Sequence, residues 1–325
     1  MWNKTILVGA AFFVSMAGSP IAVAQSFPDK PLKLLIPFTP GGVTDILGRL
    51  AAQKLGESLG QPVVVENRGG AGGIIGAEAA AKSAPDGYLI FFGSTGTLSS
   101  APSLQPKLPY DPIKSFAPIS LLANAPVVIV VNSSLPVKNL KDLIDLAKAK
   151  PGDIKFGSAG TGHFLHVAGE ALAIASGTKL FHVPYKGAAQ AIVDQIAGRI
   201  DIMVDAITPY QPHIQAGKLR PLAVANPKRL GGVPDLPTTA EAGLPGYEFA
   251  SRFGLLTPAG TPAPILRRLN AETVKALGTR EMLDTLNKAG LDPFPSTPEE
   301  YASLIVSDLA IWQKVVKQAG IKLDQ

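Results

Sequence analysis

The sequence contains no cysteine among its 325 residues, no run of basic residues, and few aromatic residues, which make up 6% of the chain. Without cysteine there is no thiolate nucleophile. The absence also fits an oxidising compartment, in which stray thiols are a liability. Without a basic stripe or an aromatic stacking platform, the chain lacks both features by which proteins bind nucleic acids. We therefore expect no nucleic-acid partner.

Motifs for nucleotide binding and covalent catalysis are also missing. No G-x-x-x-x-G-K-[ST] loop occurs, and residues 70–76 read G-A-G-G-I-I-G, which misses the G-x-G-x-x-G spacing of a dinucleotide site. Ser94 and Ser158 lack the G-x-S-x-G frame of a serine hydrolase. The sequence therefore predicts no catalytic residue and no cofactor.

One group of residues has a spacing compatible with metal binding. His163, His166 and Glu170 share one helical face through their i, i+3, i+7 spacing. No fourth ligand is apparent in the sequence, although protein metal sites of this kind need one. We therefore expect no metal.

A long apolar run occurs only near the N-terminus, where Ile6 to Ala17 is apolar but short for a membrane span. A lysine precedes the run at position 4, and Ala22-Val23-Ala24 follows it as a small-residue cleavage site. These features predict a signal peptide over residues 1–24, cleaved after Ala24, and a mature protein in the periplasm. A retained membrane anchor is the competing interpretation.

The remaining composition is that of a globular protein, with 46% hydrophobic and 17% charged residues. The chain has 30 basic and 25 acidic residues, so loss of Lys4 with the signal peptide leaves 29 basic residues and a net charge of +4. A mildly positive field helps to collect an anionic small molecule, although solubility explains it equally well. About 300 mature residues are enough for two domains with separate cores.

Strands and helices are expected to alternate along the chain. Leu32 to Pro37 is a short apolar run bounded by prolines, which predicts a buried strand. A Pro-Gly-Gly turn follows, and an apolar residue at every fourth position predicts a helix over 43–59. Similar units recur, so we expect an α/β fold in which each lobe is a mostly parallel sheet flanked by helices.

Two crossings between lobes are expected. The apolar segments 119–122 and 127–131 flank Asn124-Ala125-Pro126, which we interpret as the first crossing. A strand at 222–225 is interpreted as the return, so the hinge lies near 123–125 and 224–226. The predicted division is residues 25–123 and 227–325 in lobe 1 and residues 124–226 in lobe 2.

Three turns after predicted strands are rich in glycine, serine and threonine, namely 39–45, 93–97 and 157–163. Ligands of such sheets bind beyond the carboxyl ends of the strands. Free backbone N–H groups and the dipole of a following helix form an anion site without a charged side chain. Short loops are often rich in these residues anyway, but three of them in two lobes favour a ligand cleft between the lobes.

Several motifs, in a fixed order, resemble the periplasmic receptors of the tripartite tricarboxylate transporter family, also called Bug receptors. They are Pro37-Phe38-Thr39-Pro40-Gly41-Gly42 with Asp45, residues 59–68 (LGQPVVVENR), Ala71-Gly72-Gly73, residues 84–88 (APDGY), residues 183–187 (VPYKG), residues 198–205 (GRIDIMVD) and residues 241–246 (EAGLPG).

This resemblance implies a type II periplasmic binding-protein fold that closes on a small organic carboxylate. The family's ligands include dicarboxylates, amino acids and aromatic acids, held by backbone amides and waters. The ligand residues that it implies here are Phe38, Thr39, Gly41, Gly42, Thr44 and Asp45, then Ser94, Thr95 and Thr97, then Ser158, Gly160, Thr161 and His163, with Asp205 at a strand end. Phe38 suits a role against the ligand or in the core equally well.

The chain departs from the family pattern at Thr39, at His163 and at Arg252-Phe253. Arg252 is a candidate partner for a second ligand carboxylate, because its guanidinium binds such groups through two parallel hydrogen bonds. A solvated surface arginine is the competing interpretation.

These observations lead to a working hypothesis of a monomeric receptor that hands its carboxylate to a membrane permease without covalent chemistry. The alternative is a periplasmic hydrolase or isomerase that uses Asp205 and His163 as acid and base. A purely structural interaction protein is a third interpretation, and it would show neither ligand binding nor turnover.

Overall fold

The computed structural model describes residues 2, 27–41, 43–105, 107–185 and 187–322. The predicted signal peptide (apart from Trp2), its cleavage site after Ala24, and Gly42 lie outside the described residues. Within the described ranges, no helix has both the length and the apolar character needed to cross a membrane.

The first lobe is built on a six-stranded sheet with the strand order β11-β4-β10-β3-β1-β2. Strand β1 pairs in parallel with β2 and β3, whereas β10 runs antiparallel to β3 and β4, and β11 runs antiparallel to β4. The strands are β1 (Leu32–Ile36), β2 (Val63–Asn67), β3 (Leu89–Ser94), β4 (Phe116–Pro126), β10 (Ala250–Pro258) and β11 (Asp292–Pro293).

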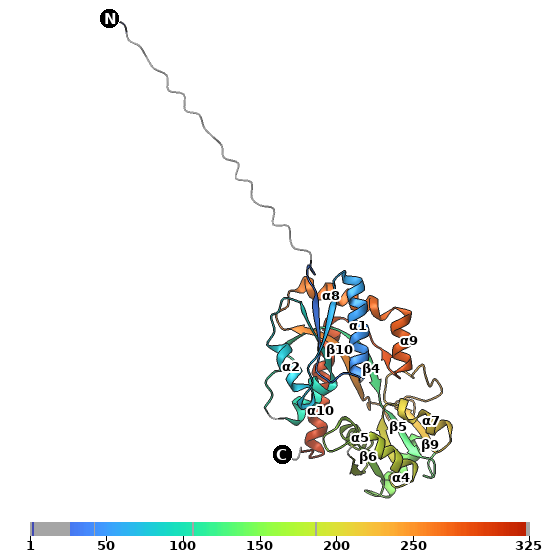
Figure 1. Ribbon diagram of the computed structural model, residues 1–325. Helices are drawn as coiled ribbons and strands as arrows, with labels where there is room; N and C mark the ends of the chain where they lie inside the picture. The colour runs from blue at the N-terminus through green and yellow to red at the C-terminus, as the bar shows by residue number, and fades with distance from the viewer. Residues whose placement is uncertain (1, 3–26, 42, 106, 186, 323–325) are drawn as a thin grey trace.

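Helices cover both faces of this sheet (Figure 1). Leu34 and Ile36 of β1 pack in one core with Leu47 of α1, and the intervening Leu35 packs on the opposite face with Phe91. Burial on both faces explains why this strand is apolar at every position except the exposed Lys33, rather than alternating. The elements around the sheet are α1 (Val43–Leu59), η1 (Ala71–Gly73), α2 (Ile74–Ala81), η2 (Gly96–Ser100), α3 (Ala101–Leu104), α8 (Ala263–Leu277), α9 (Arg280–Lys288) and α10 (Pro298–Gln318).

The second lobe is built on a five-stranded sheet with the order β7-β6-β8-β5-β9. Strand β6 is parallel to β7 and β8, and β5 is antiparallel to β8 and β9. The strands are β5 (Val128–Asn132), β6 (Lys155–Ser158), β7 (Phe181–Pro184), β8 (Ile202–Asp205) and β9 (Leu219–Val224). The helices are α4 (Leu140–Ala149), α5 (Phe164–Ser176), α6 (Ala188–Ile196), η3 (Thr208–Tyr210) and α7 (Gln211–Gln215).

Both sheets are therefore mixed, and the expectation of mostly parallel sheets is corrected. A parallel neighbour requires a crossover connection, usually helical. Strand β5 enters the second sheet directly from β4 through the single residue Val127, and it runs against both of its neighbours. Strand β10 likewise runs against β3 and β4.

The first crossing also differs from the expectation. Residues 124–126 continue β4, where Asn124 pairs with Arg252 and Ala125 pairs with Ser251. The connection between the sheets is Val127, whose N–H and C=O bond to Phe249 and Ala225 of the returning chain. The two crossings thus lie side by side.

Helix α10 contacts both lobes. A capping box formed by Thr297 and Glu300 begins it, as their spacing predicts. Tyr301 belongs to a core cluster of the first sheet, whereas Trp312 and Val315 belong to a core cluster of the second. Figure 1 shows α10 leaving the first sheet and ending near α5.

Candidate functional site

A cavity of about 520 Å³ lies between the two sheets, at the turns that follow β1, β3 and β6. The second lobe contributes the loop 159–164. The first lobe contributes the aromatic Phe38 and Phe253 and a set of small or hydroxyl-bearing residues, which are Thr44, Gly72, Ser94, Gly96, Ser100 and Ser251.

All three glycine-, serine- and threonine-rich turns contribute to this cavity. The predicted ligand residues that line it are Phe38, Thr44, Ser94, Gly160, Thr161 and His163. No lysine or arginine is found among the lining residues that the structure describes. The site therefore offers amides and hydroxyl groups, and its attraction for an anion must come from them and from the helix termini.

Two helices begin at the cavity. Thr44 lies in the first turn of α1, and the loop through Gly160 and His163 leads directly into α5. The first N–H groups of a helix have no partner within the helix, and the helix dipole places partial positive charge there. His163 is the N-cap of α5, and its Nδ1 accepts from the N–H of Leu165 at 3.2 Å. Burial lowers the pKa of His163, so this ring is neutral at neutral pH.

Asp45 stabilises the first turn through hydrogen bonds and does not line the cavity. It is buried, and its carboxylate accepts hydrogen bonds from Gly41 N–H (3.0 Å), Arg49 Nε (3.0 Å) and Asn67 Nδ2 (2.9 Å). The bond from Arg49 is the main reason why the pKa of Asp45 is lowered to about 2. Gly41 and the exposed Thr39 lie on the same turn, outside the lining set.

The second turn is held by two threonines that are themselves buried. Thr97 Oγ1 accepts from the N–H of Ser94 at 3.2 Å and donates to its carbonyl at 3.1 Å. Thr95 Oγ1 accepts from the N–H of Arg252 at 2.8 Å. Neither threonine lines the cavity. Ser94 does line it, with 4% of the residue exposed, and its Oγ has no hydrogen-bond partner among the described residues.

The third turn is held by Ser158, which is fully buried beneath it. Its Oγ accepts from the N–H of Gly160 at 3.1 Å and lies 2.6 Å from Nε2 of His182. Gly160 has φ +129° and Gly162 has φ +76°, a left-handed region that favours glycine. These two glycines let the backbone of the loop approach the cavity closely.

Two predicted ligand residues are engaged elsewhere and do not line the cavity. Nη1 of Arg252 lies 2.6 Å from both carboxylate oxygens of Asp308 on α10, and both side chains are largely buried. Asp205 accepts from Tyr210 OH (3.1 Å) and from Ala206 N–H (2.7 Å), and burial raises its pKa to about 6.

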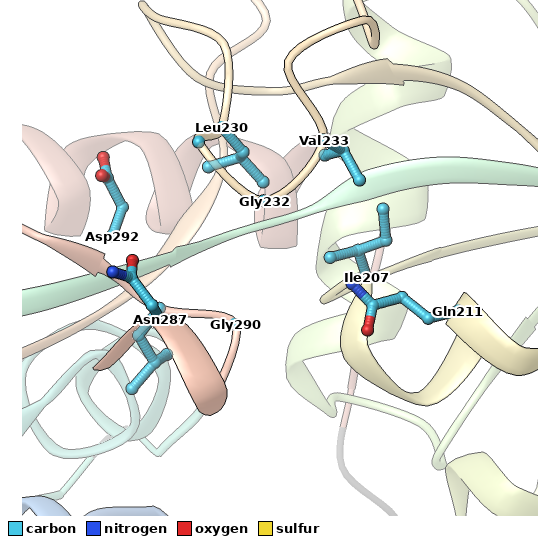
Figure 2. Close-up of a pocket in the computed structure, with 10 residues that line it drawn as sticks. Ile207, Gln211, Leu230, Gly232, Val233, Asn287, Gly290 and Asp292 are labelled. Atoms are coloured by element: carbon cyan, nitrogen blue, oxygen red, sulfur yellow. The ribbon is translucent and has the colours of Figure 1, made fainter. Parts of the chain in front are cut away.

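A second cavity, of about 390 Å³, lies beside β11, an edge strand of the first sheet. Figure 2 shows Asn287 and Asp292 on one side, Ile207 and Gln211 on the other, and the loop 230–233 between them. Burial raises the pKa of Asp292. Sequence reasoning missed this cavity because its walls come from three distant segments without a shared motif.

Sequence reasoning also missed part of the first cavity. Ser251 and Ser100 line it, although neither belongs to the three turns. Ser251 is brought there by the antiparallel pairing of β10 with β3 and β4, which no local pattern indicates. Gly72 could have been found from the glycine-rich run 69–73 that precedes α2.

Comparison with known proteins agrees with this geometry. The family model described as "Tripartite tricarboxylate transporter family receptor" matches residues 47–321. This chain belongs to that receptor family. Protein BugT of Bordetella pertussis is 35% identical over 325 residues, which cover 99% of each chain.

Two solved structures of relatives are complexes with a carboxylate. R. palustris Rpa4515 with adipate is 36% identical, with a TM-score of 0.72 over 91% of this chain and 99% of that one. MatC from Rhodopseudomonas palustris with bound malate is 33% identical, with a TM-score of 0.68 over 89% of this chain and 100% of that one. The receptor thus shares the two-lobe fold of periplasmic binding proteins.

Proposed function

We propose that this receptor captures a small organic carboxylate in the cavity between its lobes and delivers it to the membrane permease of a tripartite tricarboxylate transporter. It would do so as a monomer in the periplasm, after cleavage of the signal peptide behind Ala24. The observation that carries the proposal is a cavity between two sheets that is lined mainly by glycine, serine and threonine and that lies at the N-termini of α1 and α5.

The unpaired Ser94 Oγ supports this proposal independently. A buried hydroxyl group without a partner costs free energy, and such a group in a cavity is explained by a ligand that completes it. A carboxylate is a suitable ligand, because hydrogen bonds to a charged acceptor are the stronger ones. Relatives described with adipate and with malate make dicarboxylates the first compounds to test.

The experiment is a melting-shift screen of residues 25–325 against adipate, malate, aspartate and nicotinate, with the corresponding amides as uncharged controls. A carboxylate that binds should stabilise the protein by about 2.7 kcal/mol at a concentration a hundredfold above its Kd. The amides should produce no shift. An absence of any shift across the acids would contradict the proposal.

The same samples separate a receptor from an enzyme. A receptor leaves the compound unchanged, whereas a hydrolase or isomerase consumes it. Proton NMR of each binding acid after prolonged incubation should therefore show no new signals. Asp205 is engaged with Tyr210 and Ala206 and lies outside the lining of the cavity that contains His163, which favours the receptor.

A further inference from the structure

Two histidines beneath the third turn have no role in the proposed capture of a carboxylate. His166 of α5 and His182 of β7 stack face to face, with ring centroids 3.6 Å apart and ring planes 7° from parallel. The ring of Phe156 on β6 packs near both, at centroid distances of 6.2 Å and 4.9 Å. Burial, and secondarily the neighbouring His166, lower the pKa of His182 to about 4.

Each ring bonds to the turn that lines the cavity. The N–H of Gly162 donates to Nδ1 of His166 at 3.0 Å, so this nitrogen carries no proton. The neutral His166 therefore has its proton on Nε2, which lies 3.7 Å from Glu170 Oε1. Nε2 of His182 lies 2.6 Å from Ser158 Oγ, which also accepts from the N–H of Gly160.

Protonation of His166 would change this arrangement in a definite way. The added proton must go to Nδ1, which then becomes a donor facing the N–H of Gly162, and two donors cannot form a hydrogen bond. A charged His166 would have the Glu170 carboxylate as its partner at 3.7 Å, whereas a charged His182 would stack 3.6 Å from another histidine ring. Of the two rings, the geometry therefore makes His166 the one that can accept a proton beside an anionic partner.

The surroundings of the pair are mostly uncharged. Among the described residues, Glu170 is the only acidic group within ion-pair distance of either ring. His163, the N-cap of α5, lies three residues before His166 and lines the cavity. Tyr185, just after β7, bonds to Asp194 of α6 at 2.9 Å. The sheet presents Phe156 and Ser158 of β6 to the pair, and the end of β8 carries Asp205.

We propose that the neutral stack of His166 on His182 holds the third turn in the shape that accepts a carboxylate. One proton on His166 Nδ1 would release this turn. Both histidines are positioning residues, since they act through the backbone of Gly160 and Gly162. The affinity for a carboxylate then falls as the pH falls. The inference rests on the proposed function for its ligand, whereas release of the turn is measurable without one.

The first test uses ligand-free protein labelled with ¹⁵N-glycine. As the pH is lowered from about 8 to about 5, the amide signal of Gly162 should move together with the ring signals of His166. In His166→Asn, whose amide oxygen can replace Nδ1 as acceptor but cannot titrate, the signal should stay fixed. The matched control is His213→Asn on α7, which should behave like the wild type. A Gly162 signal that ignores the His166 titration would overturn the proposal.

The second test measures the binding of adipate by calorimetry over the same pH range. The Kd should rise about tenfold towards low pH in the wild type and in His213→Asn, the loss expected for one hydrogen-bonded contact. In His166→Asn it should rise only as far as adipate itself becomes protonated. Equal pH dependence in all three proteins would overturn the inference. If adipate fails to bind while Gly162 still follows His166, release of the turn stands and the assignment of adipate as ligand fails.

Discussion

Ser94 illustrates how one residue can separate a binding role from a structural one. Its Oγ is buried, lines the cavity and has no partner among the described residues. Ser94→Ala should therefore leave the melting temperature of the ligand-free protein unchanged or slightly raised, because no internal hydrogen bond is lost. The Kd of the best acid in the screen should rise about tenfold, the cost of one hydrogen bond to a charged group. Calorimetry measures the Kd of the acid for the wild type and for Ser94→Ala.

The control for this prediction is Ser303→Ala on α10, where the serine Oγ donates to the carbonyl of Glu299 at 2.9 Å and lies outside the cavity. It should bind the acid as the wild type does. If Ser94→Ala is fully folded and its Kd is unchanged, Ser94 does not bind the ligand.

The raised pKa of Asp205 predicts how the stability of the protein depends on pH. Burial raises its pKa in the folded protein to about 6, above the usual value of 3.8. The folded protein therefore holds a proton that the unfolded chain has lost, and stability falls as the pH rises from about 4 to about 6. Asp205→Asn should add up to about 3 kcal/mol to the free energy of unfolding at neutral pH, and almost nothing near pH 4.

Urea unfolding of the wild type and Asp205→Asn across this pH range measures the difference. The asparagine side chain of the variant would still present an oxygen to Tyr210 and Ala206, so the comparison isolates the charge. A gap between the two proteins that is independent of pH would mean that the carboxylate is not destabilised by burial.

At the scale of elements, the ion pair of Arg252 with Asp308 joins β10 to α10. Arg252→Met should destabilise the protein by about 3–5 kcal/mol, because the buried Asp308 carboxylate loses its partner. The double variant Arg252→Met/Asp308→Leu should recover most of that loss. Denaturant unfolding of all three proteins measures these effects. If Arg252 instead binds a second ligand carboxylate, the double variant will lose affinity, whereas a structural pair predicts unchanged affinity.

Elements with local signals were predicted well from the sequence. The repeat of apolar residues at every fourth position gave the bounds of α1, and the spacing of Thr297 and Glu300 gave the start of α10. The direction of β5 and β10 was missed, because antiparallel pairing between distant segments leaves no local mark. The continuation of β4 through Pro126 was missed for a related reason: it depends on pairing with Ala250, more than a hundred residues away.

The candidate site was predicted in outline. Glycine- and hydroxyl-rich turns after strands indicate backbone amides at a sheet edge, and all three turns do contribute to one cavity. Local composition could not separate residues that face the cavity, such as Ser94, from residues that hold the turns, such as Asp45 and Thr97. That distinction depends on which side chains find internal partners, whether nearby in the sequence, as Ser94 is for Thr97, or more distant, as Asn67 is for Asp45.

At the scale of the whole molecule, the lobes touch at a second place beside the second cavity. The Oγ1 of Thr208, on η3, donates to the carbonyl of Ala289 at 3.3 Å, just before β11 of the first lobe. Gly290 follows with φ +69°, and a Cβ added to it would overlap Thr208 Oγ1. Glycine is thus required here both by the backbone conformation and by the approach of the two lobes.

Gly290→Ala should therefore hold the lobes apart at this edge and limit their closure on a carboxylate. We expect the Kd of the best acid to rise about tenfold, since a state that must first be strained is less populated. Adding Thr208→Ala removes the overlapping oxygen and should restore most of the affinity. The left-handed φ still costs about 1 kcal/mol in both variants, so both should melt at a lower temperature than the wild type.

Calorimetry and small-angle X-ray scattering, each with and without the acid, measure affinity and closure separately. Because Thr208→Ala cannot relieve backbone strain at position 290, recovery of affinity without recovery of melting temperature would show that contact between the lobes, and not local strain, limits binding.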